Sequence, residues 1–182
     1  MGGSFSFCSV GEGQLPGSHA ATEFVAWYNG HPEFAGSVFD LSAERAVIVG
    51  NGNVALDVAR VLASDVDALA RTDIADHALE ALAVSRIREV VVLCRRGPRQ
   101  AACTVPELLG LSTFDSAVEA GVTELSGGIK ADLLREFRDR PASGQGRRIV
   151  LRYLSSPVEV LGRNKDRRRS GRTAARLPVR GA

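Results

Sequence analysis

Short runs of apolar residues alternate along the chain with amphipathic segments. Two runs are continuous and rich in β-branched residues, at 46–49 (Ala-Val-Ile-Val) and 90–94 (Val-Val-Val-Leu-Cys). A strand that is covered on both faces, as in a parallel sheet, has this pattern. Apolar spacings of three and four residues predict helices at 54–62, 73–84 and 129–137. The order strand, helix, strand predicts a Rossmann-like βαβ unit, and therefore an α/β fold with a central parallel sheet.

Weaker signals predict the other elements. Ser18 and Thr72 are the expected N-caps of the helices that follow them, because their hydroxyls can accept a bond from a free helical N–H. The segments at 34–44 and 65–72 are expected to be connections. The further expected elements are a helix from Ser18 to about Asn29, one or two helical turns at 104–109, and strands at 149–154 and 158–161.

Composition divides the chain into three expected segments. Residues 1–17 are rich in Gly and Ser and have no periodicity, which predicts an irregular segment. Residues 18–162 contain the expected elements and form the predicted domain. Residues 163–182 hold eight basic side chains against one acid, with few large apolar residues, which predicts a disordered tail. No aromatic residues lie among these charges, so we expect no specific nucleic-acid binding.

The cysteines and histidines give no sign of a metal site, because the three of each show neither CxxC nor HxxxH spacing. The sparse cysteines, Cys8, Cys94 and Cys103, favour a reducing compartment, and we expect a cytoplasmic protein whose thiols are buried. No stretch approaches the roughly 18 apolar residues of a membrane span, and no secretory signal is visible. No catalytic residue is expected within the chain.

A glycine turn, Gly-Asn-Gly-Asn-Val-Ala at 50–55, stands directly between the strand at 46–49 and the following helix. In this position the pattern is typical of a dinucleotide-binding turn. Gly50 permits the tight turn, and Gly52 leaves room for a pyrophosphate because a Cβ there would collide with it. The free N–H groups and the positive end of the helix then attract the anion. The expected pyrophosphate-binding residues are Gly50, Asn51, Gly52, Asn53 and Val54.

The second strand ends in Arg95 and Arg96, where an NAD site would have an acid to hold the ribose 2′-hydroxyl. Two guanidiniums can bind a 2′-phosphate through charge-assisted hydrogen bonds. At roughly 1.5–3 kcal/mol for each such bond, the pair favours NADP by about 3 kcal/mol, on the order of a hundredfold in affinity. Two alternatives stay open: the turn joins strand and helix without a ligand, and the arginines are solvated surface charges.

Four separated motifs resemble the adrenodoxin reductase-like ferredoxin–NADP+ reductases, and the likeness runs from about Gly11 to Gly162. The motifs are Leu-Pro-Gly-Ser at 15–18, Phe-Val-Ala-Trp-Tyr-Asn at 24–29, Gly-Asn-Gly-Asn-Val-Ala-Leu-Asp-Val-Ala-Arg at 50–60 and Arg-Arg-Gly-Pro at 95–98. The resemblance implies that Asn51 to Val54 bind the NADP pyrophosphate, that Arg95 and Arg96 hold the 2′-phosphate, and that Glu107 contacts the adenosine side. It also implies FAD on a separate domain, which takes hydride from NADPH and passes single electrons to ferredoxin.

The chain also departs from that two-domain flavoprotein family. It contains no second GxGxxG fingerprint for FAD, and Gly110 stands where the family has an active-site glutamate. We therefore expect an incomplete gene fragment that carries the NADP(H)-binding module of the reductase. The alternative is a remnant that binds NADP(H) without turnover.

Overall fold

A parallel β-sheet forms the centre of the protein. The computed structural model describes residues 4–8, 17–119, 127–141, 144 and 146–157. Within this part of the chain the sheet has six strands in the order β2-β1-β3-β4-β6-β5, and every neighbouring pair is parallel. The expected α/β fold with a central parallel sheet is confirmed. The strands are β1 (Ser4–Cys8), β2 (Ser18–Ala20), β3 (Arg45–Val49), β4 (Glu89–Cys94), β5 (Asp115–Glu119) and β6 (Arg148–Tyr153).

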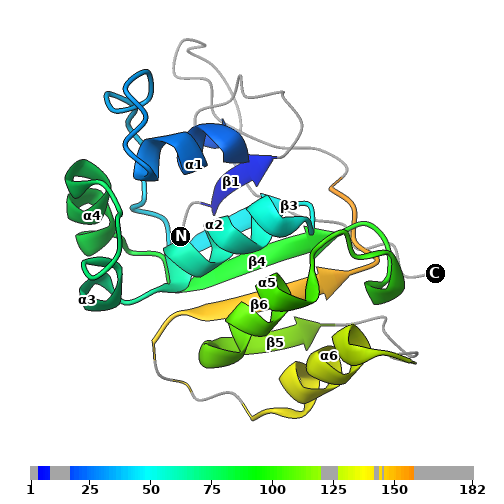
Figure 1. Cartoon of the computed structure of the whole chain (residues 1–182). Coiled ribbons are helices and arrows are strands. Elements are labelled where there is room, and N and C mark those ends of the chain that lie inside the picture. The colour runs from blue at the N-terminus through cyan, green and yellow to red at the C-terminus, as the bar shows by residue number, and fades with distance from the viewer. Residues whose placement is uncertain (1–3, 9–16, 120–126, 142–143, 145, 158–182) are drawn as a thin grey trace.

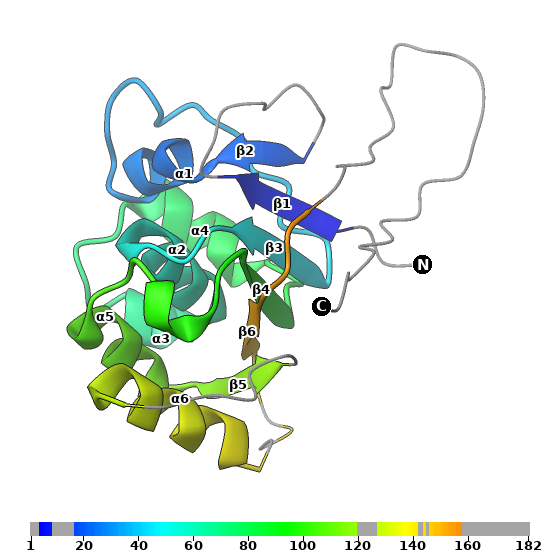
Figure 2. The same ribbon diagram turned by 90° about the vertical axis from the view of Figure 1, so that its right-hand side faces the viewer.

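The helices gather on one face of this sheet, as the two perpendicular views of the ribbon show (Figures 1 and 2). None of those that the structure describes is long and apolar enough to cross a bilayer. The α-helices are α1 (Ala21–Tyr28), α2 (Asn53–Ala63), α3 (Val66–Leu69), α4 (Asp76–Ala83), α5 (Val105–Leu109) and α6 (Ile129–Asp139), and two 3₁₀ turns are η1 (Pro98–Gln100) and η2 (Gly110–Thr113).

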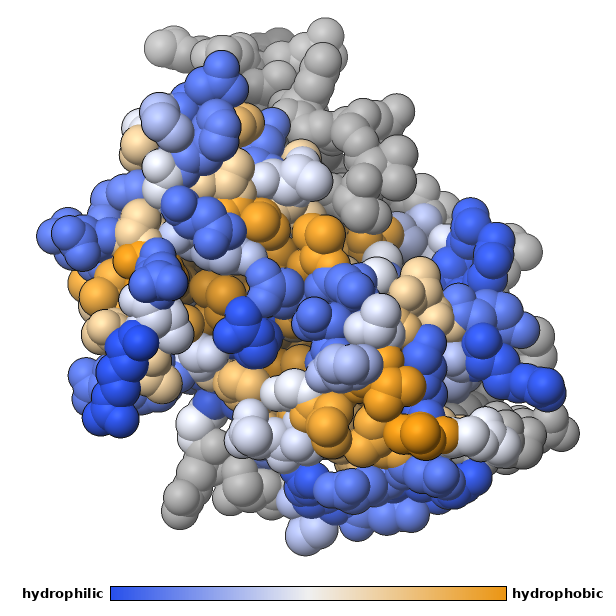
Figure 3. Space-filling model, viewed as in Figure 1, coloured by the Kyte–Doolittle hydropathy of each residue, from blue (hydrophilic) through white to orange (hydrophobic). Residues whose placement is uncertain are grey.

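Side chains alternate between the two faces of the central strands. Ile48, Val92 and Leu151 are almost completely buried and belong to the main core together with residues of the helices. Seen from the helix side, hydrophobic residues are visible between the hydrophilic residues of the outer surface (Figure 3). The alternate strand residues build a second, smaller apolar cluster on the other face. Apolar residues on both faces explain why β3 and β4 are continuous hydrophobic runs.

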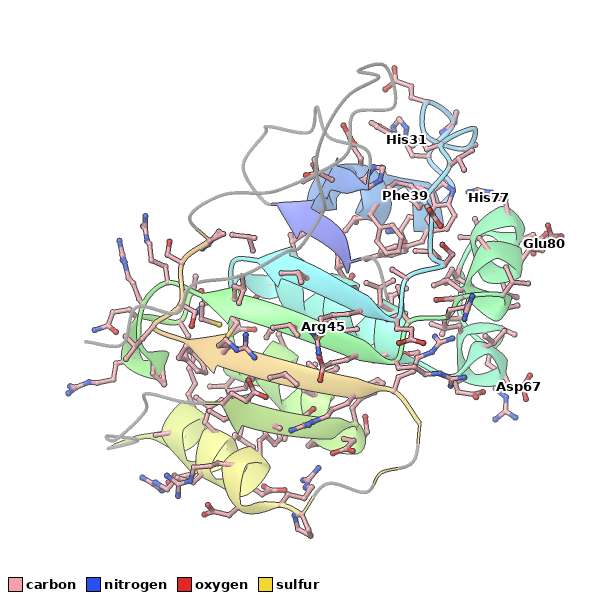
Figure 4. The ribbon with its side chains drawn as sticks, turned by 180° about the vertical axis from the view of Figure 1, so that it is seen from behind. His31, Phe39, Arg45, Asp67, His77 and Glu80 are labelled. Atoms are coloured by element: carbon pink, nitrogen blue, oxygen red, sulfur yellow. The ribbon has the colours of Figure 1, made fainter. Side chains whose placement is uncertain are left out.

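The face away from the helices also carries charged pairs between neighbouring strands. Arg45 on β3 pairs with Glu89 on β4, and Arg152 on β6 pairs with Glu119 on β5. Figure 4 views the sheet from this side and labels Arg45 among its strands. Each pair joins opposite charges across adjacent strands, an arrangement that contributes modestly to sheet stability.

Most expected elements lie where the sequence predicts them. The strands at 46–49, 90–94 and 149–154 correspond to β3, β4 and β6. The helices predicted after the glycine turn and at 129–137 correspond to α2 and α6, and the short turns at 104–109 contain α5.

Several expectations are wrong. The segment 1–17, predicted to be irregular, contains β1, and Ser18 does not cap a helix because it begins the extended strand β2. The helix after Thr72 begins later, at Asp76, with Ala75 as its N-cap. In α6, Ile129 is 65% exposed, and the buried side contains Ala131, Leu134 and Phe137.

Two further elements were not predicted, and two predicted segments lie outside the described residues. The connection at 65–72 contains the short helix α3, whose N-cap Asp65 accepts a hydrogen bond from the Asp67 N–H. Strand β5 gave no sequence signal, because an edge strand with acids at both ends lacks an apolar run. The strand predicted at 158–161 and the tail 163–182 lie outside the described residues.

Candidate functional site

The glycine turn and the two arginines lie at the same edge of the sheet. Gly50 follows β3, and Arg95 follows β4, its parallel neighbour. The Gly50 N–H donates to the Leu93 carbonyl at 3.0 Å, so the ladder between these strands continues into the turn. The turn and Arg95 therefore leave the sheet side by side, at its carboxyl edge.

The strand order makes this edge a natural place for a ligand. From β1 the chain crosses to β2 on one side, whereas from β3 it crosses to β4 on the opposite side. In open α/β sheets such a reversal leaves a crevice between the two connections, and ligands bind there outside the carboxyl ends of the strands. The glycine turn after β3 lines this position.

The two glycines of the turn serve different purposes. Gly50 has a φ of 122°, a conformation that a side chain rarely adopts, so the backbone itself requires glycine there. Gly52 has a φ of −83° and a ψ of 176°, which suit any residue, and a Cβ added to it would meet no atom within 4 Å. Neither the backbone nor the packing of the described residues requires glycine at position 52. The open space above it fits a ligand that approaches the backbone closely.

The N-terminus of α2 faces this space with its positive charge uncompensated. Its N-cap is Gly52, which offers no side-chain acceptor, and its first turn contains no acid. The N–H groups of a first helical turn have no acceptor within the helix, and they carry the positive end of its dipole. Asn53 and Val54 are exposed here. An anion such as a diphosphate can bind at this point.

Two hydrogen bonds hold the short helix α5 beside the glycine turn. The Asn53 side-chain oxygen accepts a hydrogen bond from the Thr104 N–H at 2.8 Å, and the Asn51 carbonyl accepts one from the Cys103 N–H at 3.0 Å. Thr104 is the N-cap of α5, so the starts of α2 and α5 lie together. Glu107, partly buried on α5, is thereby held near the turn.

Arg95 and Arg96 are exposed, and within the described part of the chain neither forms an ion pair. Their guanidiniums are therefore available to an anionic ligand. The strand pairing brings both arginines to the same edge as the turn.

Beneath this edge lie two neutral thiols. Cys94 and Cys103 are buried, as the sequence predicts. Burial raises the pKa of the Cys94 thiol to about 12 and also raises the pKa of Cys103 above its usual value. Thiols that stay protonated at neutral pH are poor nucleophiles and poor metal ligands. No group of three or more potential metal-ligating side chains occurs among the described residues.

A polar network on the helix layer is separate from this edge. The Tyr28 hydroxyl on α1 donates to a carboxylate oxygen of Asp57 on α2, and Arg60 donates to the other oxygen. His77 hydrogen-bonds the Trp27 carbonyl at 2.9 Å and contacts the Trp27 ring. These contacts join α1 to α2 and α4, so their role is structural.

Comparisons with known proteins agree with this geometry, although no family model matches the chain. It is 49% identical over 168 residues to the NADPH-ferredoxin reductase FprA of Mycobacterium tuberculosis, covering 85% of this chain and 37% of that relative. It is 57% identical over 174 residues to the mitochondrial NADPH:adrenodoxin oxidoreductase of Salvelinus fontinalis, covering 91% of this chain and 33% of the relative. The solved structure of Mycobacterium tuberculosis FprA in complex with NADPH matches with a TM-score of 0.78 at 46% identity, over 85% of this chain and 37% of that one.

The chain is homologous to one part of the ferredoxin–NADP+ reductases. It spans about a third of the length of the curated reductases that it matches. The resemblance inferred from the four sequence motifs is therefore confirmed. The structure brings Gly50, Asn51, Gly52, Asn53, Val54, Arg95, Arg96 and Glu107 to one edge of the sheet, and their ligand-binding roles remain predictions.

Proposed function

We propose that this chain is an NADP(H)-binding module of the ferredoxin–NADP+ reductase type. The observation that carries the proposal is the open space above Gly52, where neither φ nor packing requires glycine. This space lies at the N-terminus of an 11-residue helix and beside two exposed arginines without ion pairs among the described residues. The donor set suits a ligand that has a diphosphate and one additional phosphate.

The residues divide the ligand between them. The backbone amides from Asn51 to Val54, in the glycine turn and at the start of α2, hold the pyrophosphate, because they present free N–H groups and the positive helix end. Arg95 and Arg96 bind the 2′-phosphate of the adenosine ribose through charge-assisted hydrogen bonds. Glu107 on α5 contacts the adenosine side. The two guanidiniums favour NADPH over NADH by about 3 kcal/mol.

In a complete reductase this module would present the nicotinamide to FAD. When bound, FAD would supply the step from hydride transfer to single-electron transfer. We place FAD on a separate domain of the complete reductase, as the resemblance to the family implies. The electron acceptor would be a ferredoxin-type iron–sulfur protein, and the location would be the cytoplasm.

A binding module without turnover is the second candidate for the chain by itself. Gly110, which begins η2 directly after α5, stands where the resemblance places an active-site glutamate. A preparation that binds NADPH but is colourless and does not reduce ferricyanide would support this candidate. A yellow preparation that reduces ferricyanide would exclude it.

Titration with NADPH and NADH tests the binding function. We expect the wild-type chain to prefer NADPH by about a hundredfold, and the double variant Arg95→Ala/Arg96→Ala to lose most of this preference. The double variant Arg71→Ala/Arg86→Ala removes two exposed arginines elsewhere on the surface and should keep the preference. Equal wild-type affinities for the two nucleotides would overturn the assignment.

A further inference from the structure

Leu154 has an unusual backbone and an unusual exposure at the edge of the proposed site. Its φ is 53°, and it is the one residue other than glycine with a positive φ in the described part of the chain. A branched side chain in the left-handed region is strained. Leu154 is also 49% exposed, although it is a large apolar residue.

The surrounding chain holds this conformation in place. Ser155 is buried, and its N–H donates to the Cys94 carbonyl at 3.0 Å across the β4–β6 ladder. Its hydroxyl donates to the Tyr153 carbonyl at 3.1 Å. Both bonds are made by Ser155, and the second spans Leu154, so together they fix the turn after β6. Strain that the neighbouring structure enforces in this way often occurs at ligand sites.

The Leu154 side chain points toward residues 95–97, the loop that contains the two arginines. A Cβ added to Gly97 would lie 4.0 Å from a terminal carbon of Leu154. Gly97 directly follows Arg96, and Leu154 directly follows Tyr153, the β6 partner of Cys94. The exposed isobutyl group therefore stands beside the proposed 2′-phosphate site.

The order of the strands then orders the parts of the ligand. The pyrophosphate would lie at the end of β3 and the 2′-phosphate at the end of β4, and β6 is the next strand in the sheet. The 2′-phosphate belongs to the adenosine ribose, so the base continues toward the end of β6. Building on the proposed function, we infer that Leu154 is a positioning residue for the purine base, whose face packs on its side chain.

Two variants separate this role from a role in stability. Leu154→Asn keeps a residue that tolerates the left-handed region and removes the apolar surface, whereas Leu154→Gly also relieves the strain. We expect both variants to weaken binding of adenosine 2′,5′-bisphosphate about fivefold, since roughly half of a leucine side chain would lose its contact. Leu154→Gly should nevertheless be at least as resistant to urea as the wild type.

The contact with the base is tested by comparing, with calorimetry, the affinities for two ligands that differ in the purine. Ribose 2,5-bisphosphate lacks the purine, so its affinity should be the same in wild type and both variants. Val84→Asn is the control, because Val84 is 79% exposed at the end of α4 and should leave both affinities unchanged.

The outcomes distinguish the two proposals. Failure of the wild-type chain to bind adenosine 2′,5′-bisphosphate would contradict the proposed function itself. Normal wild-type binding with unchanged affinity in both Leu154 variants would overturn the base contact alone. Equal losses for the two ligands would also overturn it, since the loop rather than the base would then be responsible.

Discussion

We expect Gly52 to matter for ligand binding and not for the stability of the fold. Its backbone conformation suits an N-cap residue, and a side chain there would enter open space. We expect Gly52→Ser to unfold in urea at the same free energy as the wild type or a few tenths of a kcal/mol higher, because serine is a good N-cap. Its affinity for NADPH should fall at least about tenfold, since the side chain occupies the place of the pyrophosphate.

The neighbouring glycine provides the matched control. Gly50→Ser places a side chain at a φ of 122°, so the fold itself should lose about 1–3 kcal/mol. The two substitutions thus have opposite signatures in urea unfolding and fluorescence titration. Full NADPH affinity in Gly52→Ser would show that the space above this residue is not a ligand site.

At the scale of elements, one hydrogen bond fastens the start of α5 beside the start of α2. Asn53→Asp keeps an acceptor for the Thr104 N–H and adds an acid where the helix dipole favours one, so urea unfolding should change by less than about 0.5 kcal/mol. The same charge would repel a diphosphate at the helix N-terminus, and we expect NADPH affinity to fall about tenfold.

A second substitution separates charge from the lost bond. Asn53→Ala removes the acceptor and should destabilise the fold by about 1 kcal/mol, with a smaller effect on binding than Asn53→Asp. Affinity that is lower in the alanine variant than in the aspartate variant would contradict an anion at this helix end. Salt strengthens the comparison, because the penalty in Asn53→Asp should decrease as ionic strength rises.

The elements also show how far the sequence predicts the fold. β3, β4 and α2 were predictable because their patterns are local: continuous apolar runs and a helical stripe directly after a glycine turn. β2 and β5 were not, because three residues, or five with acids at both ends, give no period to detect. The insertion of β6 between β4 and β5 was equally hidden, since it depends on contacts between distant parts of the chain.

The candidate site divides in the same way. The turn at 50–55 and Arg95 were placed at one edge from the sequence, because adjacent parallel strands end at the same edge. The bond from the Thr104 N–H to Asn53 joins residues about 50 positions apart, and the conformation of Leu154 is a strained backbone. No sequence pattern marks either feature. Their nucleotide-binding roles remain predictions.

At the scale of the whole molecule, buried tyrosine and cysteine side chains that stay neutral in the fold make its stability fall at alkaline pH. Burial raises the pKa values of Tyr28, Cys94 and Tyr153, and the hydrogen bond to Asp57 raises that of Tyr28 further. Each group is neutral in the folded protein, while in the unfolded chain its pKa returns to about 9 for cysteine or 10 for tyrosine. A raised pKa in the fold means that stability is complete below these values and is lost as pH rises above them.

Unfolding in urea at several pH values tests this conclusion. We expect the free energy of unfolding to be steady near pH 8 and to fall above about pH 9–10, by up to about 1.4 kcal/mol per pH unit for each group that titrates. Tyr153→Phe removes one such group and should flatten the fall above pH 10 while it leaves the value at pH 8 nearly unchanged. His31→Gln alters an exposed residue and should reproduce the wild-type curve. Parallel curves for wild type and Tyr153→Phe would mean that this tyrosine ionises as easily in the fold as in the unfolded chain, and that water reaches the carboxyl end of β6.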